Sequence, residues 1–192
     1  MPDVVLRIDA STGSGQIVHR IDLSDVLPYQ VPRSAPGITA SGDRIALLRW
    51  NAERGGAELV LVHTDGTTMV TAPEAPDTAS LGQLALSADG SIATASTEHY
   101  PRRLLACDLA TGTWSVLQEG DVMDVAASVS ADGTALAMII HDASGASVSH
   151  ARLERSSAGA LRITDARFLG HNEWSSQNSL RQHFITYSRQ RA

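Results

Sequence analysis

Histidine, tryptophan and glutamate side chains recur at intervals that would gather them if the chain repeats its fold. The candidate binding residues are Trp50, His99, His141, His171, Glu173 and Trp174. Histidine can act as an acid or a base near neutral pH, and tryptophan is frequent at contact surfaces. His141 follows His99 by 42 residues, but no H-x-H or H-x-x-x-H pair is present to fix a metal site. We therefore expect a binding face, with no metal site and no assigned catalytic residue.

Several motifs of catalytic and cofactor-binding proteins are missing from the sequence. All 15 basic residues other than histidine are arginine, so the lysine that a Walker A loop needs is absent. No G-x-S-x-G, H-E-x-x-H or EF-hand pattern occurs. Cys107 is the only cysteine, which excludes an intramolecular disulfide and indicates a small buried side chain. We expect no cofactor, and a non-enzyme is favoured over an enzyme.

Charge and hydropathy bear on the partner and the location. A formal net charge of -6 argues against nucleic-acid binding, which needs a clustered basic face. No apolar run approaches the roughly 20 residues of a membrane span, and the N-terminal segment MPDVVLRIDAS does not resemble a signal peptide. We therefore expect a cytoplasmic protein, unless the chain is truncated from a longer one. A composition rich in arginine and alanine is typical of a GC-rich bacterial genome.

Two kinds of glycine turn alternate along the chain. The first kind contains Gly42 (TASGDRIA), Gly90 (LSADGSIA) and Gly133 (VSADGTALA), at spacings of 48 and 43 residues. The second kind contains Gly13, Gly66, Gly112 and Gly159, at spacings of 53, 46 and 47 residues. Asp-Gly and Thr-Gly turns between short runs of Val, Ile, Leu and Thr are typical of β-hairpins, because glycine readily adopts positive φ. These structural turns therefore mark a long repeat.

The segments between the turns have the length and composition of strands. In the two clearest repeats we expect strands over 82–86, 91–96, 103–108 and 113–118, and over 124–129, 135–141, 147–153 and 160–165. No long segment shows the 3.6-residue apolar period of a helix. Four-stranded antiparallel units at this period predict an all-β fold, a β-propeller or part-propeller of about four blades. A β-sandwich is the alternative, because it also alternates short strands with turns.

The hairpin motifs resemble those of a known family. SADGSIA and SADGTALA are similar to the S-x-D-G-x-x-(I/L)-A hairpin of WD-repeat-like β-propellers of TolB type, and DLATG from Asp108 is similar to their Asp-x-x-Thr-Gly turn. Ala88 and Ala131 replace the proline that usually precedes the aspartate, and the repeats lack the recurring Gly-His and Trp-Asp signatures of true WD repeats. The resemblance implies a propeller that serves as a scaffold, a sensor or a gate for an attached enzyme, and it names no ligand.

We expect one propeller-like domain over 1–192. Its blades are predicted over 1–24 (outer strands 4–8 and 16–21 only), 36–75, 80–120, 122–168 and 172–192 (inner strands near 172–177 and 181–188 only). The two ends together would make a fourth blade that closes a ring. The alternative is a part-propeller, truncated from a longer one or completed by a second copy, because unpaired sheet edges favour association.

Mapped onto the repeat, the candidate residues fall on one rim. In a propeller, the loops between blades and the loops between second and third strands lie opposite the glycine turns. Trp50, His99 and His141 then end successive second strands, and the remaining three residues lie in a loop between blades. We expect a non-catalytic binding or scaffold propeller that engages a protein or peptide partner through this polar rim. The alternatives are a gating or sensor fragment of a larger protein, and a small enzyme that uses rim histidines and carboxylates.

Overall fold

The chain folds into β-strands joined by short turns. The computed structural model describes residues 4–8, 11–20, 37–39, 43–51, 56–63, 69–71, 81–97, 100–122 and 124–173. Every regular element in these ranges is a strand. The predicted all-β class is therefore confirmed.

The strands form three four-stranded antiparallel sheets and one hairpin, which we name sheets A to D in chain order. Sheet A pairs β1 (Val4–Ile8) with β2 (Gly15–Arg20). Sheet B contains β3 (Gly37–Ile38), β4 (Arg44–Asn51), β5 (Gly56–His63) and β6 (Met69–Thr71). Sheet C contains β7 (Leu81–Leu86), β8 (Ile92–Thr97), β9 (Arg102–Asp108) and β10 (Thr113–Gly120). Sheet D contains β11 (Asp124–Val129), β12 (Ala135–Asp142), β13 (Gly145–Arg155) and β14 (Leu161–Glu173).

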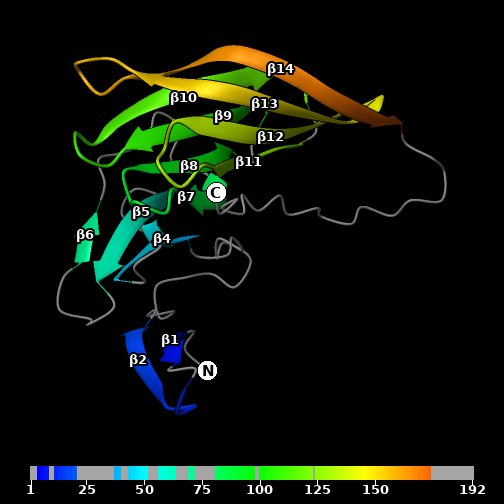
Figure 1. The fold of residues 1–192 in the computed structure, drawn as a ribbon. Helices are drawn as coiled ribbons and strands as arrows, with labels where there is room; N and C mark the ends of the chain where they lie inside the picture. Colours follow the sequence, from blue (N-terminus) through cyan, green and yellow to red (C-terminus); the bar gives the residue numbers. More distant parts are fainter. Residues whose placement is uncertain are drawn as a thin grey trace.

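In each four-stranded sheet, strands adjacent in the chain are adjacent in space, which is the arrangement of a propeller blade. Figure 1 shows sheets B, C and D following one another in chain order, with β14 on the far side from sheet B. In sheets C and D, each predicted strand matches an observed one within about two residues at either end, except at the end of β14.

The last strand of sheet D is much longer than predicted. β14 continues to Glu173 because its partner β13 begins at Gly145, so the ladder between them extends past the expected end at 165. Asn172 and Glu173 pair with Ala146 and Gly145. The inner strand expected from 172 is therefore wrong for these two residues, and the expected blade end at 168 lies within β14. The rest of 172–192 lies outside the described residues, so ring closure stays a prediction.

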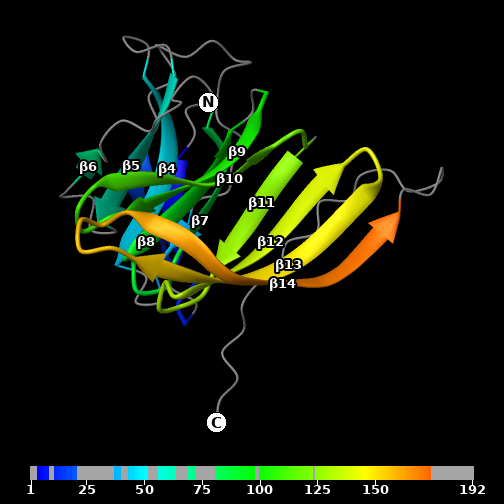
Figure 2. The ribbon, with the colours of Figure 1, turned by 90° about the horizontal axis from the view of Figure 1, so that it is seen from above.

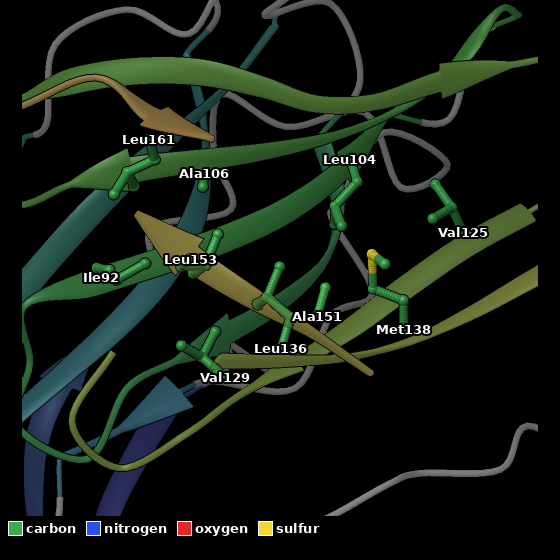
Figure 3. Close-up of a cluster of buried hydrophobic side chains, with 10 residues drawn as sticks. All are labelled: Ile92, Leu104, Ala106, Val125, Val129, Leu136, Met138, Ala151, Leu153 and Leu161. Atoms are coloured by element: carbon green, nitrogen blue, oxygen red, sulfur yellow. The ribbon is translucent and has the colours of Figure 1, made fainter. Parts of the chain in front are cut away.

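Two apolar clusters join the sheets face to face. One cluster lies between sheets B and C and includes Leu48, Leu105 and Cys107. The other lies between sheets C and D, and Figure 3 shows its ten buried side chains: Ile92, Leu104, Ala106, Val125, Val129, Leu136, Met138, Ala151, Leu153 and Leu161. Consecutive residues of β9 therefore alternate between the clusters, because side chains along a strand point to opposite faces. Sheet C is thus buried on both sides.

The turns between the first and second strands of sheets C and D share one hydrogen-bond pattern. Oγ of Ser87 accepts hydrogen bonds from the N–H groups of Ser91 (3.1 Å) and Ile92 (2.9 Å), and it donates one to Oδ1 of Asp89 (2.6 Å). Ser130 makes the equivalent three bonds in sheet D. The serine of the repeated motif thus accepts two backbone N–H groups, and the aspartate shares the first of them, since the N–H groups of Ser91 and Thr134 also donate to Asp89 and Asp132.

Sheet B builds its turn with a changed order of residues. Oγ1 of Thr39 accepts a hydrogen bond from the N–H of Arg44 (3.2 Å) and donates one to Oδ1 of Asp43 (2.8 Å). Asp43 follows Gly42 in the sequence, whereas Asp89 precedes its glycine. A hydroxyl and a carboxylate therefore stabilise this turn also, although the Asp-Gly motif is missing.

Glycine lets the turns of successive sheets interlock. Gly90 and Gly133 have φ values of +71° and +70°. A Cβ at Gly90 would lie 2.9 Å from Cγ2 of Thr39, and one at Gly133 would lie 2.8 Å from Oγ of Ser91. The N–H of Asp89, in the turn of sheet C, also donates to the carbonyl of Ala131, in the turn of sheet D (2.9 Å). Of the glycines in the predicted second kind of turn, Gly13, Gly112 and Gly159 also have positive φ, and Gly66 lies outside the described residues.

Candidate functional site

The ends of sheets C and D opposite the serine turns carry a set of loops that we call the loop rim. Its described segments are Tyr100–Pro101, Asp121–Val122, Asp142–Gly145 and His171–Glu173. Antiparallel pairing brings these segments to one end of each sheet, since Arg102 lies opposite Gly120 and Gly145 lies opposite Glu173. Figure 2 shows the β12–β13 hairpin and the end of β14 at the same end of sheet D.

The structure describes four of the six candidate residues. His99 and Trp174 lie outside the described residues. Trp50 lies in β4 and Glu173 ends β14, and only the backbone of these two residues is described. His141, near the end of β12, is half-buried. Of the candidate residues, His171 and Glu173 therefore lie in the loop rim of sheet D, and His141 lies one residue before the rim segment that begins at Asp142.

His141 and His171 lie on opposite faces of sheet D. His141 is paired with Ala146, whereas His171 is paired with the next residue along β13, Ser147. Side chains opposite each other in a ladder share a face, and consecutive residues alternate between faces. The structure therefore does not bring these two histidines into one site.

His171 instead lies near a carboxylate of the β12–β13 turn. Oδ1 of Asp142 accepts hydrogen bonds from the hydroxyl (2.6 Å) and the N–H (2.8 Å) of Ser144 and from the N–H of Gly145 (3.2 Å). The Ser144 hydrogen bonds lower the pKa of Asp142, and positive charge on His171 lowers it further. The carboxylate therefore stays ionised and fixes the tip of this hairpin.

Tyr100 and Asp121 form a second polar pair on the loop rim, in sheet C. The Tyr100 side chain is 70% exposed, and Asp121 is also exposed. The negative charge of Asp121 raises the pKa of the Tyr100 phenol, and its carboxylate also accepts a hydrogen bond from the phenol. Sequence reasoning selected His99 and passed over Tyr100, the next residue in the EHYPRR segment.

Two large apolar side chains are exposed on β14 as it approaches the loop rim. Phe168 is 65% exposed and Leu169 is 64% exposed. Phe168 pairs with Ser149, which places it on the same face of sheet D as the buried Leu161. The β13–β14 ladder shifts register between Arg152 and His150 of β13. Without this bulge, alternation along β14 would place Phe168 on the face of the sheet opposite to Leu161. The apolar face of the sheet C–sheet D junction thus continues into solvent.

The described part of the rim offers contact groups and shows no reaction centre. Across the described ranges, no three His, Cys, Asp or Glu side chains lie close enough together to hold a metal ion. Cys107 lies in the core, where burial and the nearby Asp108 charge raise its pKa to about 12. A thiol with this pKa does not form the thiolate that catalysis needs at neutral pH.

Comparison with solved structures supports the fold. TolB from Acinetobacter baumannii superposes with a TM-score of 0.58 at 15% sequence identity, over 83% of this chain and 37% of that chain. The putative TolB from Agrobacterium tumefaciens gives a TM-score of 0.54 at 9% identity, over 88% of this chain and 58% of that one. A chain from a study of two prolyl endopeptidases gives 0.54 at 12% identity, over 83% and 25%. At these identities the similarity shows the fold alone, and the chain spans less than two thirds of each protein.

Three further findings bear on identity. No helix in the described part of the chain is long and apolar enough to cross a membrane. No curated protein sequence matches this chain. A family model described as the lipoprotein LpqB beta-propeller domain matches residues 23–181. The predicted resemblance to TolB-type propellers is confirmed by this match and by the two TolB structures. The chain therefore belongs to the family of lipoprotein LpqB β-propeller domains.

Proposed function

We propose that the chain is a non-catalytic binding or scaffold propeller whose loop rim engages a protein or peptide partner. The observation that carries the proposal is the exposure of three large side chains toward this end of sheets C and D: Tyr100, Phe168 and Leu169. Exposed apolar groups bordered by polar residues are characteristic of interaction surfaces, and aromatic residues often dominate their affinity. Asp121, Asp142 and His171 supply the polar border.

A gating or sensor role within a larger protein is a second candidate. It is favoured by the extent of the match, because the chain spans 37% of one TolB chain and 25% of a prolyl endopeptidase chain. Such a role would use the same surface, since a sensor or a gate also contacts another polypeptide. The cytoplasmic location and the bacterial source expected from the sequence stay predictions.

The proposal is tested by selecting peptides from a random display library on the purified chain and measuring their dissociation constants. We expect Phe168→Ser to weaken the selected peptides about tenfold or more, as truncation of an aromatic contact residue does. Val116→Ser is the matched control, because Val116 is an exposed apolar residue within β10, before the loop rim. Equal affinities for Phe168→Ser and the parent chain, or failure to select any peptide, would contradict the proposal.

A further inference from the structure

Tyr100 and Asp121 lie just beyond the last residue pair of the β9–β10 ladder. Arg102 and Gly120 form the last residue pair between β9 and β10. Tyr100 lies two residues before this pair and Asp121 one residue after it, so both leave the sheet at the same point. Both side chains are exposed there, and they lie close enough for the charge of Asp121 to raise the pKa of the Tyr100 phenol.

The arginines nearest to this pair have other partners. Nη1 of Arg102 donates to the carbonyl of Thr97 (2.9 Å), and Nε of Arg103 forms an ion pair with Oε2 of Glu119 (2.7 Å). None of the ion pairs within the described ranges includes Asp121. A carboxylate has about four acceptor positions, more than a single phenol can occupy. The exposed carboxylate therefore has capacity for a charged donor from outside.

We propose that Tyr100 and Asp121 recognise a lysine or arginine side chain of the partner, so that the loop rim takes a basic peptide. The aliphatic stem of the cation packs on the exposed tyrosine ring, and its charged head pairs with the carboxylate. An aromatic ring also attracts a cation directly. The net charge of -6 on the chain favours approach of a positive segment. This inference rests on the proposed function and specifies the chemistry of the partner.

The test uses three blocked peptides that differ in one side chain: acetyl-Gly-Arg-Gly-amide, its lysine analogue and its citrulline analogue. Citrulline has nearly the shape of arginine but carries no charge. Each peptide is titrated into the isotope-labelled chain while the backbone amide signals are followed by NMR. We expect the arginine and lysine peptides to shift the signals of Tyr100 and Asp121, and the citrulline peptide to shift them several-fold less. Added salt should weaken the response, because the contact is exposed.

Variants separate the two side chains. Asp121→Asn keeps the shape but removes the charge, and we expect it to lower the affinity for the arginine peptide at least about fivefold. Tyr100→Phe should retain most of the binding and Tyr100→Ser should lose it, because the ring supplies the contact. Asp165→Asn is the control, since Asp165 is an exposed aspartate that already pairs with Arg167. An equal response to citrulline and arginine, or an Asp121→Asn variant that binds like the parent, would overturn the inference.

This outcome is distinguishable from failure of the proposed function. If display-selected peptides bind, depend on Phe168 and show no excess of lysine or arginine, the loop rim is a binding surface and only the basic-partner inference fails. If no selected peptide binds and the three blocked peptides leave the Tyr100 and Asp121 signals unchanged, both proposals fail.

Discussion

Asp108 and Arg155 join sheets C and D through an ion pair in which one partner is almost fully buried. Nε of Arg155 lies 2.9 Å from Oδ2 of Asp108, whose side chain is 1% exposed, while the Arg155 side chain is 42% exposed. Oδ1 of the same carboxylate accepts the N–H of Ala110 (2.9 Å), which begins the turn into β10. The aspartate of the DLATG motif therefore stabilises its own turn and the neighbouring sheet together.

Removal of the two partners should have unequal effects on the free energy of unfolding. Arg155→Ala leaves a buried carboxylate without its cation, so we expect a loss of about 2 kcal/mol. In the double variant Asp108→Asn/Arg155→Ala the buried charge is gone, and an asparagine oxygen can still accept the Ala110 N–H. Urea unfolding should therefore show the double variant to be more stable than Arg155→Ala alone. A double variant that is no more stable than Arg155→Ala alone would refute this account.

The interlocked turns predict unequal effects of alanine at two glycines with nearly equal φ. Gly13 has a φ of +68° and open space where a Cβ would lie, whereas Gly133 has a φ of +70° and a Cβ there would meet Ser91 and Ile92. Gly13→Ala should cost about 1 kcal/mol for the left-handed backbone alone. Gly133→Ala should cost about 3 kcal/mol, because the turn must also move away from sheet C. Chemical denaturation of the two variants measures the difference, and equal losses would show that the turns do not pack tightly.

Local sequence was sufficient to predict the repeated elements. The turns at Ser87 and Ser130 are encoded within a few residues, because one hydroxyl, one carboxylate and one glycine complete each of them. The strands on either side are short and bounded by these turns, so their positions follow. The turn at Thr39 differs in motif, yet the same groups reappear in another order.

The exposure of the contact residues, and the sheet face on which each lies, depend on strand length and pairing, which the local sequence does not determine. Phe168 lies beyond residue 165, where the sequence predicts the end of its strand, whereas β14 extends to Glu173. Its side chain faces the sheet C–sheet D junction because of a bulge, and a shift of one residue reverses every face along a strand. The sequence places His141 and His171 on one predicted rim, but strand pairing puts them on opposite faces of sheet D.

The turn carboxylates predict a loss of stability in acid. The Ser130 hydroxyl, followed by the N–H and hydroxyl of Thr134, lowers the pKa of Asp132 below its usual 3.8. A depressed pKa in the folded state contributes stability that is present above the unfolded-state pKa and is lost as the pH falls through the folded-state value. We therefore expect the urea midpoint of the parent chain to exceed that of Asp132→Asn at pH values above 3.8, and the gap to close as the pH falls below 3.8. A gap that is independent of pH would mean that ionisation of Asp132 does not contribute.

The pKa of the Tyr100 phenol should depend on the charge of Asp121, which lies far from Tyr100 in the sequence. The negative charge on Asp121 opposes formation of the Tyr100 phenolate, and the hydrogen bond to the carboxylate stabilises the protonated phenol, so the pKa lies above 10.0. Asp121→Asn should bring this pKa down toward the ordinary value. The chain has three tyrosines, so the ultraviolet titration of Tyr100→Phe is subtracted from that of the parent to isolate the Tyr100 curve. The same subtraction is made in the Asp121→Asn background. Coincident Tyr100 curves in the two backgrounds would show that the side chains do not interact, and the recognition of a basic side chain by this pair would lose its structural basis.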